Sequence, residues 1–185
     1  MEVNFLGHKL SSLQESIVYN AVDSALDFLM SKRLKKTMII DIYIVKDLIY
    51  KNMVWGDVGP EDEDRSPKVF EMRLNYSGVK SFEKLMETLS HELVHLTQFA
   101  TRRLYYFSDG DTARFDGQRY SLDDTKYNDR PWEVEAFWLE YQVFDRIMEE
   151  NKNIVSYIEK KSQKGWGYSA ESELFSTKSD YVGVA

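Results

Sequence analysis

The chain contains no cysteine, and only three prolines and three histidines occur among its 185 residues. Without cysteine there can be no disulfide bond and no metal site built from thiolates. So few prolines also exclude a long proline-rich linker. Any metal site in this chain must therefore take its ligands from histidine or from carboxylate side chains.

Long apolar runs and an excess of basic residues are missing as well. No stretch approaches the ~20 consecutive apolar residues of a membrane-spanning helix. The N-terminus also lacks the basic start and apolar core of a signal peptide. Acidic residues outnumber basic ones by 31 to 24, whereas binding to nucleic acid needs clustered lysine and arginine. These absences predict a cytoplasmic protein that binds neither membranes nor nucleic acid, and they leave its oligomeric state open.

The composition is that of a globular protein, with 43% hydrophobic and 30% charged residues. Helical periodicity predicts helices over residues 10–36, 81–104 and 131–151. Runs of β-branched and aromatic residues predict strands over residues 37–50 and 68–76. The fold class expected from this pattern is α+β.

The segments between these elements carry turn signals. Residues 55–67, with the acidic run 61–64, predict a solvated loop, and two Asp-Gly pairs predict a hairpin within residues 105–121. After residue 160 the chain becomes polar and rich in small residues. We therefore expect one domain over residues 1–160, followed by a C-terminal tail over residues 161–185.

Residues 91–95 read His-Glu-Leu-Val-His. On a helix, side chains four positions apart project from nearly the same face, so His91 and His95 can bind one Zn²⁺ ion. Glu92 lies about 100° further round the helix, where it can reach a metal-bound water without being a ligand. The pattern predicts two zinc ligands and a catalytic base.

The rest of this helix supports a metal site over a coincidental pair of surface histidines. Six apolar residues fall on the side of the helix opposite His91, and this stripe is expected to face the core. They are Phe82, Leu85, Leu89, Leu93, Leu96 and Ala100. The helix is thus expected to bury its back and to turn both histidines towards a cleft.

A catalytic zinc site needs a third protein ligand and one open position. No histidine follows His95, and Gln98 and Thr101 stand where the metzincin signature would place its glycine and third histidine. His8, near the N-terminus, is better explained as an exposed polar residue. A carboxylate downstream of the motif is the best remaining candidate.

The segment after Pro131 offers two such carboxylates. Periodicity places Glu133 on the apolar face of its helix, together with Ala136, Phe137, Tyr141, Phe144, Ile147 and Met148. A buried carboxylate is costly unless it is paired or bound to metal, so Glu133 is the predicted third ligand. The alternative is an acidic residue that merely favours the first turn of a helix. Glu135, expected on the other face beside Gln142 and Arg146, is the second choice.

At this point the chain resembles the gluzincin group of zinc metallopeptidases. The resemblance depends on His91-Glu92-Leu93-Val94-His95 and on Glu133 with a small residue, Ala136, three positions later. It covers roughly residues 68–150. More generally the chain is similar to compact metallopeptidases of bacteria and large phages, and more distantly to the ImmA/IrrE-like group. Many gluzincins carry an aspartate four residues after the glutamate ligand, and here that place is Phe137.

The resemblance implies a minimal zincin fold, in which a small twisted sheet packs on an active-site helix and a ligand helix. It also implies hydrolysis of peptide bonds in a protein or peptide substrate, which we expect to pair with the strand over residues 68–76. Glu140 is the candidate for orienting a ligand imidazole. Tyr120, Tyr127 and Arg130 are the candidates for stabilising the oxyanion. The alternatives are a zinc-containing binding module that is not catalytic and a metal-free scaffold.

Overall fold

The computed structural model describes residues 1–45, 55–62, 66–75 and 82–162. Its elements are β1 (Glu2–Gly7), α1 (Ser12–Leu29), α2 (Lys32–Lys35), β2 (Ile39–Val45), β3 (Gly56–Pro60), β4 (Val69–Asn75), α4 (Phe82–Ala100), β5 (Leu104–Tyr106), β6 (Thr112–Phe115), β7 (Gln118–Ser121), a 3-10 turn (Tyr127–Asp129), α5 (Pro131–Glu150) and α6 (Lys152–Ser162). Helices packed on a small mixed sheet confirm the expected α+β class. From residue 163 onward, the expected C-terminal tail lies outside the described residues.

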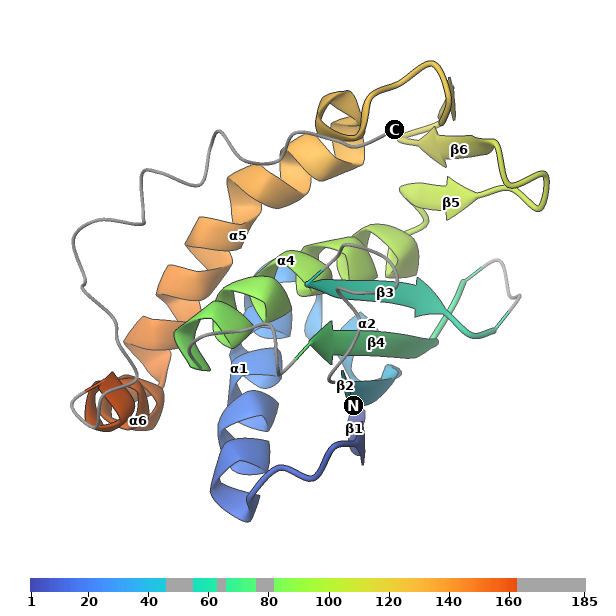
Figure 1. Cartoon of the computed structure of the whole chain (residues 1–185). Coiled ribbons are helices and arrows are strands. Elements are labelled where there is room, and N and C mark those ends of the chain that lie inside the picture. The colour runs from blue at the N-terminus through green and yellow to red at the C-terminus, as the bar shows by residue number, and fades with distance from the viewer. Residues whose placement is uncertain (46–54, 63–65, 76–81, 163–185) are drawn as a thin grey trace.

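The main sheet has four strands in the order β1-β2-β4-β3 (Figure 1). Strands β1, β2 and β4 run parallel, and β3 pairs antiparallel with β4. In β2, Ile40, Ile42 and Ile44 are buried and alternate with half-buried residues, so one face of the sheet packs into the core. The predicted strands are confirmed as β2 and β4, with residues 46–50 outside the described part of the chain.

The expected loop over residues 55–67 is wrong at its start, because it contains strand β3. Gly56, Gly59 and Pro60 have weak strand propensity, and their extended backbone is held by pairing with β4. This pairing makes β3 the edge of the sheet and places β4 in its interior. The strand over residues 68–76, with which we expected a peptide substrate to pair, has strands on both sides, so that expectation is wrong.

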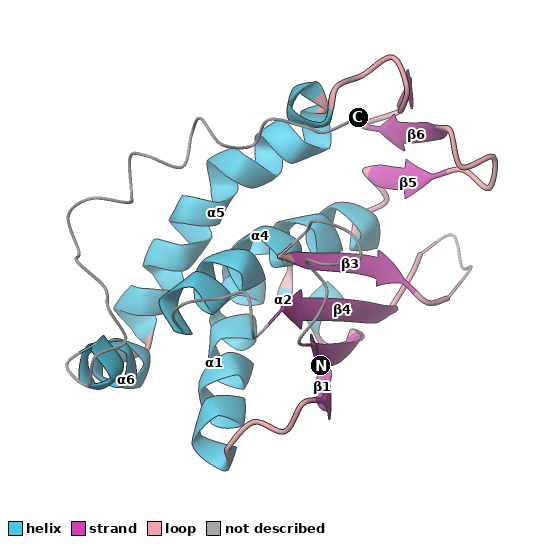
Figure 2. Ribbon diagram, in the orientation of Figure 1, coloured by secondary structure: helices cyan, strands magenta, loops and turns pink. Residues whose placement is uncertain are grey.

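Helix α4 packs against β3 and β4, and α1 and α5 pack against α4 (Figure 2). The predicted helix over residues 10–36 is interrupted: α1 ends at Leu29 and α2 begins at Lys32. Ser11 and Gln14 form a capping box at the start of α1, and Ser31 caps α2 with its side chain. The new cap at Ser31 explains why one long periodic pattern becomes two helices.

The region expected to form a hairpin is an antiparallel sheet of three strands, β5-β6-β7. The two Asp-Gly pairs lie in its turns, where Gly110 and Gly117 have φ of 77° and 83°. Asp116 also has a positive φ, 48°, which aspartate tolerates better than most residues. This small sheet lies near the meeting point of the C-terminal end of α4 and the start of α5 (Figure 1).

Helix α5 confirms the predicted helix from Pro131, which occupies its first turn. Ala136 and Ile147 are buried as expected, but Tyr141 is 47% exposed. Trp132 and Val143, which were not assigned to the core face, are fully buried instead. The buried stripe is rotated because α5 packs on both α4 and α1, two surfaces that periodicity alone cannot place.

Candidate metal centre

Helix α4 carries His91, Glu92 and His95 and is buried on nearly all sides. The six stripe residues are all buried, as predicted. The side bearing the histidines is covered too, because β3 and α5 pack over it. His95 is 7% exposed and Glu92 is 6% exposed, so the motif lies inside the protein rather than on an open helix face.

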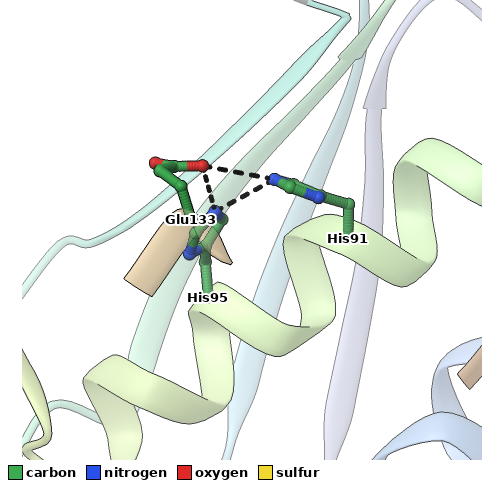
Figure 3. A group of neighbouring side chains, drawn as sticks. All are labelled: His91, His95 and Glu133. Atoms are coloured by element: carbon green, nitrogen blue, oxygen red, sulfur yellow. Dashed lines mark hydrogen bonds and ion pairs between the residues drawn. The ribbon is translucent and has the colours of Figure 1, made fainter. Parts of the chain in front are cut away.

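His91, His95 and Glu133 come together where α4 and α5 cross, as Figure 3 shows. The two Nε2 atoms of the histidines are 3.1 Å apart. Glu133 Oε2 lies 3.3 Å from Nε2 of His95 and 3.6 Å from Nε2 of His91. The structure thus groups the two histidines with the predicted third ligand, close enough to hold one metal ion.

The separations match the demands of zinc. Ligand atoms held about 2.0–2.1 Å from a tetrahedral zinc ion are about 3.3 Å apart. Glu133 is 4% exposed, and its Oε2 atom is buried without a hydrogen-bond partner among the described residues. A buried carboxylate oxygen without a hydrogen bond is costly, and a bound cation would offset that cost. Two imidazole nitrogens and one carboxylate oxygen are also the donor set of known catalytic zinc sites.

Each histidine is oriented through its other ring nitrogen. His91 Nδ1 lies 2.8 Å from Glu140 Oε2, and His95 Nδ1 lies 2.8 Å from Gln98 Oε1. Both partner atoms are acceptors, so each Nδ1 carries the proton and donates it. In a neutral ring this tautomer leaves the lone pair of Nε2 available to a metal ion, and both Nε2 atoms face Glu133.

The pKa values of the metal-free site reflect this crowding. Burial lowers the pKa of His91, but its interactions with Glu133 and Glu140 outweigh burial and raise that pKa to about 10. Burial alone would raise the pKa of Glu133, yet His91 and His95 hold it below its usual range. Without metal, a proton on His91 supplies the positive charge that this carboxylate requires.

Glu92 lies next to the triad under the edge strand. A Cβ atom built on Gly56 would lie 3.1 Å from Cγ and 3.1 Å from Oε1 of Glu92, so β3 passes directly over this carboxylate. Burial raises the pKa of Glu92, and the nearby histidines oppose that rise. A buried glutamate with a raised pKa beside a metal site has the properties of a general base.

The three predicted oxyanion donors are not equivalent. Tyr127 approaches Glu133, and desolvation of its hydroxyl, together with the Glu133 charge, raises the pKa of Tyr127. The ring of Tyr120 instead packs against the ring of Trp132, with the two ring centroids 5.8 Å apart. Arg130 donates to the carbonyls of Thr125 and Leu122 and so supports the preceding loop. Of the three, the structure brings Tyr127 towards the triad.

Glu135, the second choice for the third ligand, lies away from the triad. Its carboxylate accepts from Arg103 at 2.9 and 3.0 Å and from Gln98 Nε2 at 2.9 Å. The expectation that it lies beside Gln142 and Arg146 missed these partners, because Arg103 comes from another part of the chain. This arrangement leaves Glu133 as the carboxylate that faces both histidines.

Several residues near the site were not identified from sequence. Gln98 is one turn after His95 on the same face of α4, a spacing that could have flagged it. Tyr106 of β5 is another, because desolvation and the Glu133 charge raise its pKa to about 12. Gly56 and Arg103 gave no local signal, since their roles arise from contacts between separate elements.

None of the described helices combines the length and the apolar character needed to cross a membrane. Comparisons of the chain with protein-family models, with curated proteins and with solved structures gave no match. The resemblance to gluzincins therefore stays a prediction. It depends on the motif at residues 91–95 and on the grouping of that motif with Glu133.

Proposed function

We propose that this protein is a zinc-dependent peptidase in which His91, His95 and Glu133 bind the metal and Glu92 is the general base. The observation that supports the proposal is the group of His91, His95 and Glu133, of which His95 and Glu133 are buried and His91 nearly so, with the buried Glu92 beside it. Three protein ligands leave one position of a tetrahedral ion free for water, as catalytic zinc sites require.

The reaction follows from the positions of these groups. Zinc bound here would lower the pKa of a bound water to roughly 7 and polarise the substrate carbonyl. Glu92 accepts the water proton as the new C–O bond forms. It then delivers that proton to the amine nitrogen as the C–N bond breaks. The raised pKa of Glu92 favours this role, because it brings base and water closer in proton affinity.

Two tyrosines are suited to stabilise the negative charge that develops on the carbonyl oxygen. The pKa values of both Tyr127 and Tyr106 are raised by desolvation and by Glu133, so both phenols stay protonated at neutral pH. A neutral phenol donates a hydrogen bond, which is what an oxyanion needs. Tyr127 belongs to the 3-10 turn before α5, and Tyr106 belongs to β5.

An extended peptide is the substrate class that the sheet supports best. Strand β3 pairs with β4 on one side, and it has no second partner strand among the described residues. A peptide added to that edge would lie along the strand that passes over Glu92. Backbone pairing of this kind holds a scissile bond near the base without demanding a particular sequence.

The test compares Glu92→Gln with a control, Glu87→Gln, a half-buried glutamate on the same helix that pairs with Lys84. Cleavage of unfolded protein and peptide mixtures is followed by the release of new amino groups, and zinc is measured by elemental analysis. Glu92→Gln should keep its zinc and lose about 10²–10⁴-fold in rate, whereas the control should cleave normally. Full activity of Glu92→Gln would contradict the mechanism. Zinc binding by the wild type without cleavage of any substrate would favour the non-catalytic binding module.

A further inference from the structure

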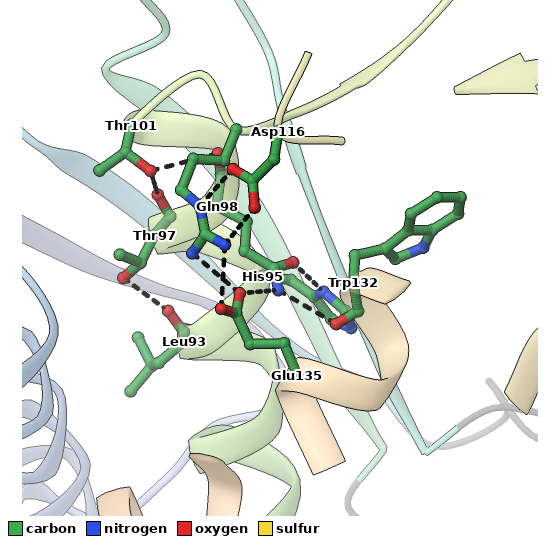
Figure 4. Close-up of polar contacts among 9 residues, drawn as sticks. Leu93, His95, Thr97, Gln98, Thr101, Asp116, Trp132 and Glu135 are labelled. Atoms are coloured by element: carbon green, nitrogen blue, oxygen red, sulfur yellow. Dashed lines mark hydrogen bonds and ion pairs between the residues drawn. The ribbon is translucent and has the colours of Figure 1, made fainter. Parts of the chain in front are cut away.

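A continuous chain of polar side chains leads from the β6–β7 turn to His95, as Figure 4 shows. The two carboxylate oxygens of Asp116 accept hydrogen bonds from two nitrogens of the Arg103 guanidinium, each at 2.7 Å. Arg103 also binds Glu135, which accepts from Gln98, and Gln98 Oε1 lies 2.8 Å from His95 Nδ1. Of these four side chains, Gln98 is the one that contacts the triad directly, through His95.

The chemistry of the members fixes the direction of every hydrogen bond. Arginine only donates and an ionised glutamate only accepts, so Glu135 must receive from both Arg103 and Gln98. The Gln98 amide nitrogen gives its second hydrogen to the Trp132 carbonyl at 3.0 Å. The Gln98 oxygen is thereby turned towards His95, whose Nδ1 must carry the proton. The lone pair on His95 Nε2 is then available to a metal.

The end of α4 explains why Arg103 can reach this position. Arg102 has a φ of 64°, which reverses the chain after the helix. The Arg103 amide donates to the Gln98 carbonyl at 2.9 Å, so these two residues are joined through their backbones as well. The reversal ends α4 at Ala100 rather than at the predicted residue 104, and it lets the Arg103 side chain meet Glu135.

We propose that Arg103 is a positioning residue for the metal centre, holding His95 in the ligand tautomer through Glu135 and Gln98. This inference rests on the proposed function, because the proposed zinc site is what requires His95 in this tautomer. The hydrogen bonds from Arg103 through Glu135 and Gln98 are the means by which Arg103 acts on His95. Asp116 fixes the other side of the guanidinium, so the β5-β6-β7 sheet is connected to the geometry of the site.

The competing explanation is that Arg103 only stabilises the fold. The stability that its ion pairs contribute is expected to be small. The Arg103 side chain is 38% exposed and Asp116 is 51% exposed. Ion pairs this exposed contribute little to the stability of the fold. Loss of the Arg103 ion pairs should therefore change the orientation of Gln98 and His95 while it leaves the stability of the fold nearly unchanged.

The chain offers a closely matched control. Arg119 lies in β7 of the same small sheet, pairs with Asp109 at 2.9 Å and stacks 4.5 Å from the Phe107 ring. Arg103 likewise pairs with Asp116 and stacks 4.9 Å from the Phe115 ring. Removing either arginine breaks an ion pair with an aspartate of the small sheet and one ring contact, but only the removal of Arg103 also breaks the ion pair with Glu135.

The first measurement is zinc affinity, by competition with a chromogenic chelator. Outer partners of metal ligands typically contribute 10–100-fold to affinity. Arg103→Ala should weaken zinc binding by about 10-fold, and Arg119→Ala should leave it unchanged. Arg103→Lys should recover part of the loss, because lysine keeps the charge but cannot hold both carboxylates in the same fork geometry. Equal affinities of Arg103→Ala and Arg119→Ala would overturn the proposal.

The second measurement uses zinc-free protein, so it decides the inference even if the wild type binds no zinc. Nitrogen-15 NMR of the imidazole rings at alkaline pH reports which nitrogen of His95 is protonated. The wild type and Arg119→Ala should show the Nδ1–H tautomer, and Arg103→Ala and Glu135→Gln should show a mixture of both. An unchanged Nδ1–H tautomer in both latter variants would overturn the proposal. Failure of the zinc site itself would appear separately, as absence of zinc from the wild type.

Discussion

Glu140 Oε2 lies 2.8 Å from His91 Nδ1, although Glu140 is two helical turns beyond Glu133 on α5. The gluzincin pattern, which stays a prediction for this chain, commonly has an aspartate four residues after the glutamate ligand. Here that place is Phe137, whose ring lies 4.9 Å from the His91 ring. One helix thus contributes both the carboxylate that faces the proposed metal position and the carboxylate that contacts His91 Nδ1.

Replacing Glu140 should weaken metal binding without removing a ligand. Glu140→Ala leaves His91 free to change its tautomer, so we expect zinc affinity to fall by about 10–100-fold in a chelator competition assay. Glu140→Gln keeps an acceptor oxygen and should lose less. Glu149→Ala, an exposed residue of the same helix, is the control. An affinity of Glu140→Ala equal to that of this control would exclude an orienting role for Glu140.

Replacing Gly56 should damage both the fold and the site. An alanine Cβ there would lie 2.8 Å from Thr88 Cγ2 and 3.1 Å from Glu92 Oε1, so β3 or Glu92 must move. Such overpacking costs about 1–3 kcal/mol. We expect Gly56→Ala to lower the free energy of unfolding by that amount in a denaturant titration and to reduce peptide cleavage.

Gly59 is the matched control for this substitution. It lies three residues further along β3, and a Cβ built there meets nothing within 4 Å. Gly59→Ala should therefore leave stability and activity close to those of the wild type. If the two alanine variants behave alike, the close approach of β3 to Glu92 has no functional role.

The zinc-free protein should lose stability as the pH rises. The folded-state pKa of His91 is raised from 6.5 to about 10, chiefly by Glu133 and Glu140 acting against burial. A raised folded pKa means that this contribution is fully present below pH 6.5 and is lost as the pH approaches about 10. Thermal unfolding at a series of pH values should show this decline in the wild type and a smaller one in His91→Ala. Parallel profiles of the two proteins would contradict the assignment.

The local parts of the site could be predicted from sequence. His91, Glu92 and His95 are separated by helical spacings, so the sequence alone places them together on α4. Glu133 followed from its position on the apolar face of one amphipathic helix, and the structure places it beside both histidines. These predictions needed only the periodicity within each helix and the exclusion of other ligand types.

The parts that could not be predicted depend on pairing between distant segments. Strand β3 has a composition typical of a loop, and only its partner β4 holds it extended. Strand β1 was missed for the same reason, because its pairing with β2 joins residues about 37 positions apart. The contact of Arg103 with Glu135 requires both the reversal after α4 and the crossing of α5.

The account depends above all on a metal ion at His91, His95 and Glu133. The most direct test is the zinc content of the wild type and of Glu133→Ala, measured by elemental analysis on protein purified without chelators or a metal-affinity tag. We expect about one zinc per wild-type chain and a large loss in the variant, because three donors hold the ion. A wild-type chain that stays free of zinc after incubation with a modest excess of the metal would contradict the central claim.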